Sequence, residues 1–445
     1  MLQTIIRNAK IVNENKIELK DVGINSLGFI EKIENQIYSS ARNEIDANGN
    51  YLLPGMIDDQ VHFREPGLTH KGDIFTESRA AIAGGITSYM EMPNVNPPTL
   101  TQELLEEKFS IAAKKSLANF SFYMGVSKDN YDEVMKTNPH SVCGIKIFMG
   151  SSTGELLVDD PLVLEKIFAN TPILIATHCE CDSIIKENLS KLIQELGEQS
   201  ISARHHPLIR NTDACYASSS YAVNLAKKYG TRLHVLHIST EKELELFSNK
   251  IPLHEKKITA EACIHHLWFT ELDYDVKGNL IKWNPAIKSV KDREAIWDAV
   301  LDGRIDVLAT DHAPHTLEEK NLPYLNAPSG GPLVQHVLLA LLDFVDSGKI
   351  SLEKVVEKIA HNVAILYQID KRGFIKEGYF ADLVMIEKKP YTVSKENILY
   401  KCKWSPFENH TFTYSIKYTW VNGALVYDNG KVIESHNAQR LVFNR

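Results

Sequence analysis

Residues 172–178 read Pro-Ile-Leu-Ile-Ala-Thr-His, a short apolar run that ends on a histidine. Residues 232–237, Arg-Leu-His-Val-Leu-His, and residues 305–311, Ile-Asp-Val-Leu-Ala-Thr-Asp, repeat this arrangement. Short apolar runs of this length are typical of strands that are buried on both faces of a parallel sheet. A polar residue after such a strand is typical of α/β enzymes, because these enzymes carry their chemistry at the carboxyl ends of parallel strands.

The chain contains eight such runs, and helix-like stretches such as Leu104–Lys115 and Tyr216–Lys228 lie between them. This alternation predicts a TIM-like (β/α)8 barrel, with an open doubly wound sheet as the alternative. Polar residues at or just past the ends of different runs favour the barrel. The runs are Gly55–Val61, Gly85–Met92, Asn119–Val126, Val142–Met149, Pro172–Thr177, Arg232–Ile238, Lys257–Cys263 and Ile305–Thr310, and the polar residues are His62, Asn94, Lys146, His178, His237 and Asp311.

The two ends of the chain have a different pattern, in which short strands alternate with turn residues. The strands expected near the carboxyl end are Asp382–Ile386, Phe412–Ile416, Tyr418–Val421 and Leu425–Tyr427. We predict that both ends pair into one small β-sandwich domain beside the barrel. The expected division is residues 1–53 and 371–445 for the β domain and residues 54–370 for the barrel.

Composition narrows the class of protein. The 445 residues carry a formal net charge of -8, which argues against nucleic acid or an anionic membrane surface as the partner. The first residues lack the pattern of a signal peptide, and no apolar run is long enough to span a bilayer. The six cysteines are scattered without a CxxC pair, so a cytoplasmic protein without a disulfide framework is expected.

The residues at the strand ends suggest a metal site. A single histidine after a strand is more often structural, but His178, His237 and Asp311 all follow apolar runs at equivalent places. Imidazole and carboxylate together suit zinc or a similar divalent ion. Since residues two apart in a strand face the same side, Asp58, Gln60 and His62 are expected to point together into the barrel mouth, and Asp59 outward.

Lys146 lies in the apolar segment 144–150, Gly-Ile-Lys-Ile-Phe-Met-Gly. Burial would lower the pKa of its amine and leave the amine free as a nucleophile. Such an amine can take up carbon dioxide to form a carbamate, an anion able to bridge two metals. A lysine that is paired with a carboxylate is the alternative.

Residues 57–67, Ile-Asp-Asp-Gln-Val-His-Phe-Arg-Glu-Pro-Gly, resemble the signature of the dihydroorotases of the amidohydrolase superfamily. Further segments match that family in order, and the resemblance covers nearly the whole chain. They are Ala83–Thr87, Met92–Asn94, Thr177–Glu180, Leu236–Thr240, Trp283–Pro285, Ala309–His315, Gly373–Leu383 and Ser405–Glu408.

The resemblance implies a site with two divalent metals, usually zinc. His62 would serve one metal and His178 and His237 the other, with carboxylated Lys146 as the bridge, while Asp311 would bind metal and shuttle a proton. The substrate carboxylate would be held by Arg64, Asn94, Asn284 and His315. Two alternatives remain. Arg64 could form an ion pair with Glu65, and the two asparagines, each of which adjoins a proline, could instead form turns.

The implied reaction is the reversible hydrolysis of (S)-dihydroorotate to N-carbamoyl-L-aspartate in de novo pyrimidine biosynthesis. A metal-bound hydroxide would attack the cyclic amide, with Asp311 as the proton shuttle. Allantoinase and dihydropyrimidinase are the alternatives, and Arg64 separates them, because their neutral substrates carry no carboxylate. The family also leads us to expect a homodimer.

Gln60 departs from the family pattern, which has histidine at this position. An amide oxygen is a poorer zinc ligand than imidazole. Either Gln60 binds weakly, or Asp58 contributes, or one metal position is loose or empty. A catalytically silent dihydroorotase-like scaffold that binds aspartate transcarbamoylase is therefore the alternative from another class. Other histidines, such as His312, could also be ligands, but supporting roles or surface positions are expected.

Overall fold

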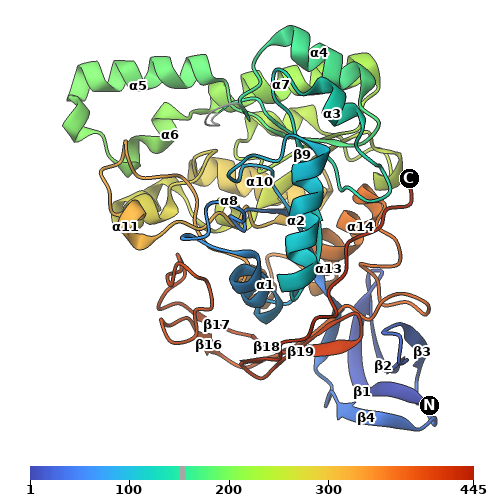
Figure 1. Ribbon diagram of the computed structural model, residues 1–445. Helices are drawn as coiled ribbons and strands as arrows, with labels where there is room; N and C mark the ends of the chain where they lie inside the picture. The colour runs from blue at the N-terminus through green and yellow to red at the C-terminus, as the bar shows by residue number, and fades with distance from the viewer. Residues whose placement is uncertain (151–155) are drawn as a thin grey trace.

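The apolar runs of the middle of the chain form parallel strands in the computed structural model, which describes residues 1–150 and 156–445 (Figure 1). Each predicted run overlaps a strand, and the run Asn119–Val126 contains two short ones that are separated by Tyr123. The strands are β6 (Met56–Val61), β7 (Ile86–Glu91), β8 (Asn119–Phe122), β9 (Met124–Gly125), β10 (Ile145–Phe148), β11 (Ile175–His178), β12 (Leu233–Val235), β13 (Ile258–Cys263) and β14 (Val307–Ala309).

These strands form two parallel sheets, β6-β7-β8 and β9-β10-β11-β12-β13-β14. The sheets adjoin where Tyr123 separates β8 from β9. At the other side, Val61 forms a parallel bridge with His312, and the backbone N–H of His62 donates to the His312 carbonyl at 2.7 Å. The parallel α/β architecture is confirmed. Closure of all the strands into one barrel stays a prediction, which these contacts support.

The two helices named from the sequence are confirmed, and each begins earlier than predicted because a polar residue caps it. Thr101 accepts a hydrogen bond from the backbone of Leu104, so α2 runs from Gln102 to Lys115. Asn211 caps α7 (Thr212–Tyr229), which ends at Gly230 in the left-handed conformation. No helix in the described part of the chain is both long and apolar enough to cross a membrane.

The other helices pack around the strands or between them (Figure 1). The longer ones are α1 (Ile74–Ala83), α4 (Pro161–Asn170), α5 (Asp182–Leu196), α10 (Val290–Asp302) and α12 (Val337–Asp346). The shorter ones are α3 (Tyr131–Met135), α6 (His206–Ile209), α8 (Ile264–Trp268), α9 (Tyr274–Lys277), α11 (Leu317–Lys320), α13 (Leu352–Val356) and α14 (Asn362–Tyr367).

The two ends of the chain share one nine-stranded sheet, seen as the adjoining blue and red strands in Figure 1. Its path is β20-β19-β18-β15-β5-β1-β2-β3, with β4 paired to β1, and the antiparallel pair β5–β15 joins the two ends. The strands are β1 (Leu2–Asn13), β2 (Lys16–Ile24), β3 (Ile30–Glu34), β4 (Ala41–Asp46), β5 (Tyr51–Pro54), β15 (Leu383–Glu387), β18 (Ser415–Val421), β19 (Ala424–Asp428) and β20 (Lys431–Val432). The predicted pairing of the ends is confirmed, whereas the two layers of a sandwich and the domain boundaries stay predictions.

The prediction of separate strands at Phe412–Ile416 and Tyr418–Val421 was wrong. Ser415–Val421 is one strand, in which the register against β15 shifts between Met385 and Ile386. This shift is a β-bulge, which interrupts the alternation that the prediction followed. Phe412 belongs instead to a two-stranded ribbon of β16 (Tyr391–Thr392) and β17 (Thr411–Phe412).

A buried polar network connects the first residue of β8 to the carboxyl-terminal segment. Arg372 donates to the carboxylate of Asp382 and, at 2.6 Å, to Asn422 Oδ1. Asn119 Nδ2 donates to the same carboxylate at 3.2 Å, and Asn422 Nδ2 donates back to Asn119 Oδ1 at 2.8 Å. Both charged side chains are at least 96% buried, with exposures of 3% and 4%.

Replacement of Arg372 by methionine is expected to lower the free energy of unfolding by about 3 kcal/mol or more, because it leaves Asp382 buried and charged without its partner. Urea denaturation followed by circular dichroism measures this. Lys388→Met removes one partner of an exposed ion pair with Asp346 and serves as the control, with no measurable effect expected. Equal stability of the two variants would contradict the prediction.

Candidate active site

The residues predicted for the site all line one cavity of about 300 Å³ at the carboxyl ends of the parallel strands. This convergence holds although the residues come from distant parts of the sequence, because parallel strands present their carboxyl ends at one edge. They are Gln60, His62, Arg64, Asn94, Lys146, His178, His237, Asn284, Asp311 and His315.

The end of β6 differs from the predicted alternation. The register against β7 shifts between Asp58 and Val61, so an extra residue is accommodated there. The Asp58 carboxylate consequently accepts from Thr310, at 2.6 Å from the hydroxyl, and lies outside the cavity. Burial raises the pKa of this carboxyl to about 8. The prediction that Asp58 shares a face with Gln60 and His62 was wrong, and this geometry argues against Asp58 as a metal ligand.

The Asp311 carboxylate contacts two side chains at the end of β6. His62 Nε2 and Gln60 Nε2 each lie 3.1 Å from Asp311 Oδ1. Asn94 Oδ1 lies 2.7 Å from His62 Nδ1 and accepts the proton of that nitrogen. The lone pair of His62 is therefore on Nε2, which faces Asp311. Gln60 donates to Asp311 through its amide nitrogen, and its oxygen accepts from Cys263 Sγ at 3.7 Å.

His178 and His237 lie next to each other in the cavity wall. His178 is the last residue of β11, and His237 follows β12 with a φ of 39°. Glu180 Oε2 lies 3.0 Å from His178 Nε2 and accepts its proton, so the lone pair of Nδ1 faces His237 Nε2 at 2.9 Å. Burial holds the pKa of both histidines below the ordinary value, which favours the neutral, metal-binding form.

Lys146 extends from β10 into the cavity and is 1% exposed. Burial lowers the pKa of its amine to about 7. Among residues 1–150 and 156–445, no carboxylate lies within ion-pair distance of the amine, and its nearest aromatic ring is that of Phe148, with the centroid at 4.6 Å. This environment argues against the alternative of a lysine paired with a carboxylate.

These donors fit divalent metals. The three imidazoles are neutral, the facing nitrogens of His178 and His237 lie 2.9 Å apart, and a carboxylate completes the set. Nitrogen and oxygen donors of this kind suit zinc and similar first-row ions. With the proton of His237 on Nδ1, both facing nitrogens would offer lone pairs to a bound cation.

Arg64 forms the opposite wall of the cavity. Its Nε donates to the Pro314 carbonyl at 3.1 Å, and Nη2 lies 3.0 Å from His315 Nε2. Burial lowers the pKa of this guanidinium only to about 10, so it stays charged at neutral pH. Its predicted alternative partner, Glu65, is instead held by Lys115 and by the backbone of Ile74. The alternative of an Arg64–Glu65 ion pair is therefore wrong.

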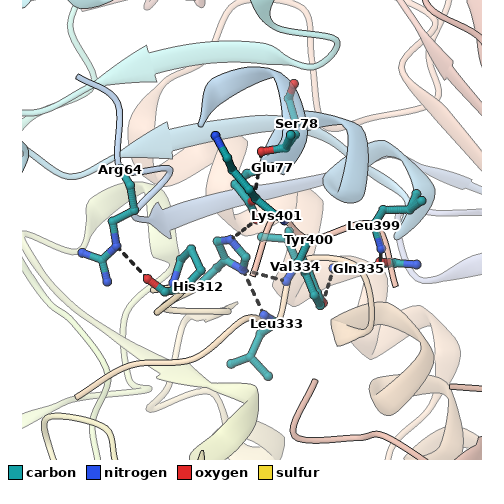
Figure 2. A network of polar contacts seen from close by, with 12 residues as sticks. Arg64, Glu77, Ser78, His312, Leu333, Val334, Gln335, Leu399, Tyr400 and Lys401 are labelled. Carbon is teal, nitrogen blue, oxygen red and sulfur yellow. Dashed lines mark hydrogen bonds and ion pairs between the residues drawn. The ribbon is translucent and has the colours of Figure 1, made fainter. Parts of the chain in front are cut away.

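The histidine that follows Asp311 has a supporting role, as predicted. Figure 2 shows His312 between Glu77 of α1 and the backbone near Leu333. His312 Nε2 donates to Glu77 Oε2 at 2.9 Å, and Nδ1 accepts from the backbone N–H of Leu333, also at 2.9 Å. Both ring nitrogens are engaged, so this network fixes the chain on the side of Asp311 away from β14.

Sequence reasoning did not select the segment Pro328–Gly330, which also lines the cavity. The buried amine of Lys320 holds this segment by donating to the carbonyls of Pro328 at 3.0 Å and Gly330 at 2.7 Å. Trp283 lines the cavity as well, and its indole nitrogen donates to the Asp311 carbonyl at 3.3 Å. No strand-end pattern marks the segment, so nothing in the sequence distinguished it from an ordinary loop.

Comparison with known proteins identifies the family of the chain. The model of the amidohydrolase family matches residues 51–426. The chain is 32% identical to a dihydroorotase of Halobacterium salinarum over 87% of this chain and 89% of the relative, and 31% identical to an allantoinase of Bacillus velezensis over 96% and 94%. The solved structure of L-hydantoinase (dihydropyrimidinase) from Arthrobacter aurescens superposes with a TM-score of 0.92 at 26% identity and 100% coverage of both chains. The chain thus belongs to the amidohydrolase family.

Proposed function

We propose that the chain is a dihydroorotase, which interconverts (S)-dihydroorotate and N-carbamoyl-L-aspartate in de novo pyrimidine (UMP) biosynthesis. Arg64 carries this proposal. It is a buried cation on the cavity wall, and no carboxylate of the described residues lies within ion-pair distance of it. A buried charge requires a counterion, and a substrate carboxylate would supply it. Dihydroorotate has such a carboxylate, whereas allantoin and dihydropyrimidines are neutral.

The neighbours of Arg64 support an anionic substrate. His315 Nε2 lies 3.0 Å from Arg64 Nη2 on the cavity wall, so the two side chains could hold one substrate carboxylate together, while the nearby Lys71 is paired with Glu319. The Oδ1 atom of Asn94 is occupied by His62, which leaves the amide N–H groups for the carboxylate. Asn284 Oδ1 is buried without a partner in the described part of the chain and would accept an N–H of the substrate.

The residues that would hold two divalent metals, with zinc as the expected ion, are His62, His178, His237 and Asp311, with Gln60 as a weaker further ligand. When such metal ions are bound, they lower the pKa of a bound water and polarise the carbonyl of the substrate. Lys146 would bridge them as a carbamate, formed when its neutral amine attacks carbon dioxide and loses a proton. The pKa of about 7 leaves a substantial neutral fraction for this step.

Proton transfer falls to Asp311. In the hydrolytic direction the ring C–N bond breaks, the carbonyl carbon gains a hydroxyl group and the departing nitrogen gains a proton. Asp311 would accept the proton that water loses and deliver it to that nitrogen. Its Oδ1 is fixed at 3.1 Å from both His62 and Gln60, which keeps the carboxylate aimed into the cavity.

Several ligand side chains on one cavity argue against a catalytically silent scaffold. A cytoplasmic homodimer stays a prediction.

One experiment tests the proposal. The purified protein is assayed with dihydroorotate, allantoin and dihydrouracil, and the same sample is analysed for metals. We expect turnover of dihydroorotate alone. Preferred turnover of allantoin or dihydrouracil would assign one of the alternative activities. A metal-free preparation that stays inactive after zinc and bicarbonate are added would contradict an enzymatic role.

Replacement of Gln60 by histidine is expected to strengthen metal retention about tenfold, because imidazole is a better zinc ligand than an amide. A chelator competition that follows zinc release measures this. Gln60→Ala is the matched control and should retain zinc no better than the natural protein. Equal retention by Gln60→His and Gln60→Ala would show that position 60 does not face a metal.

A further inference from the structure

A second group of metal-binding side chains meets outside the active-site cavity. Asp59 of β6, His234 of β12 and Glu261 of β13 are each fully buried, and one ligand atom from each lies within 4.8 Å of the others. We call this group the Asp59–His234–Glu261 cluster. None of its members lines the cavity. Asp59 directly precedes the cavity residue Gln60, and His234 lies on β12 before the cavity residue His237, so the cluster lies one layer towards the amino ends of the strands.

The hydrogen bonds of His234 define which ring nitrogen faces the carboxylates. Thr259 Oγ1 donates to the Leu233 carbonyl at 3.2 Å, so it accepts from His234 Nδ1 at 2.8 Å. The proton is therefore on Nδ1 and the lone pair on Nε2. That lone pair faces two carboxylates, with Asp59 Oδ2 at 3.2 Å and Glu261 Oε2 at 3.9 Å.

Each member of the cluster has a buried polar atom without a hydrogen-bond partner in the described part of the chain. Asp59 Oδ1, Glu261 Oε2 and His234 Nε2 are buried and make no hydrogen bond with the described residues. No lysine or arginine in residues 1–150 or 156–445 forms an ion pair with either carboxylate. The other carboxylate oxygens are held: Asp59 Oδ2, which also lies 3.2 Å from His234 Nε2, accepts from Tyr367 at 2.9 Å, and Glu261 Oε1 accepts from the backbone of His237 at 2.9 Å.

We propose that this cluster binds one divalent cation, such as zinc, through His234 Nε2 and the carboxylates of Asp59 and Glu261. Tetrahedral zinc with nitrogen and oxygen ligands at about 2.0–2.2 Å separates neighbouring ligand atoms by about 3.3–3.6 Å. The observed separations of 3.2 and 3.9 Å lie on either side of this range. Thr259 and Tyr367 supply the outer hydrogen bonds that orient metal-binding histidines and carboxylates.

The cation would also support the active site. Glu261 accepts the backbone N–H of His237, a residue whose φ of 39° is unfavourable for a side chain of this kind. A cation that fixes Glu261 therefore helps to hold His237 in place. This inference rests on the cluster's own contacts and does not require the proposed function.

Anomalous X-ray diffraction at the zinc edge tests the proposal on crystals of the full chain, prepared with zinc as the only added divalent ion. We expect a peak enclosed by Asp59, His234 and Glu261, separate from any peak in the cavity. Peaks in the cavity with none at the cluster would overturn the inference and show that a proton is shared there instead. A peak at the cluster with none in the cavity would support the inference and count against the metal ligands of the proposed function.

Zinc analysis of variants provides the second test. His234→Gln should carry about one zinc equivalent less than the natural chain, and His178→Gln should lose zinc from the cavity while the cluster peak persists. Unchanged zinc content in His234→Gln would overturn the proposal. If His234→Gln fails to fold, Asp59→Asn, which keeps the size of the side chain, replaces it, and unchanged zinc content would again overturn the proposal. The diffraction test on the natural chain does not depend on either variant.

Discussion

Lys146→Ala is expected to lower kcat/KM for dihydroorotate at least a thousandfold, or about 4 kcal/mol of transition-state stabilisation, and to release zinc. The reason is electrostatic. The buried Lys146 lines the same cavity as His178 and Asp311, and its carbamate would be the anion between two cations. Steady-state kinetics and metal analysis measure both losses. Native mass spectrometry in bicarbonate should show one carbon dioxide adduct on the natural chain and none on the variant.

Two further variants separate a carbamate from a structural lysine. Lys146→Ala leaves space for a short carboxylic acid, so added propionate should restore part of the activity. Lys146→Met fills that space and should not respond to propionate. Lys146→Arg keeps a positive charge but cannot form the carbamate, and it should be inactive. Full activity and zinc content in Lys146→Arg would contradict the proposed bridge.

The positions of the site residues were predictable because the fold makes strand ends equivalent. His178 ends β11 and Asp311 follows β14, so the apolar runs alone indicated that these side chains would meet. Lys146 lies inside β10 and was recognisable for a different reason, as a cation in a run that otherwise had to be buried. In each case the local pattern and the global topology lead to the same placement.

The departures arise where one strand contains an irregularity that periodicity cannot show. The bulge in β6 reverses the alternation between Asp58 and Val61, so Asp59 turns towards His234 and Asp58 towards Thr310. The bulge in β18 likewise joins two predicted strands into one. Lys320, which holds the segment Pro328–Gly330, was missed for another reason: a lysine in a polar stretch reads as a surface residue, and only the fold buries it.

Arg64→Met is expected to lower kcat/KM for dihydroorotate about a hundredfold or more with the zinc content unchanged. Loss of one partner of a buried, hydrogen-bonded charge pair costs about 2–5 kcal/mol, and here the lost partner would be the one that binds the substrate carboxylate. Kinetics and metal analysis on the same preparation measure the two effects. Arg64→Lys is the matched control and should be intermediate, because it keeps the charge but not the planar fork.

Stability measurements on Arg64→Met separate a loss of substrate binding from a loss of folding. Arg64 is buried without a carboxylate partner among the described residues, so methionine of similar length should leave the thermal midpoint of the ligand-free protein unchanged or raise it. Loss of activity would then reflect lost substrate contacts and not unfolding. Dihydroorotate should raise the midpoint of the natural chain and fail to do so in Arg64→Met, since stabilisation by a ligand depends on its affinity. A large loss of zinc in Arg64→Met would contradict the assigned role, because it would place Arg64 in the support of the metals instead of the substrate.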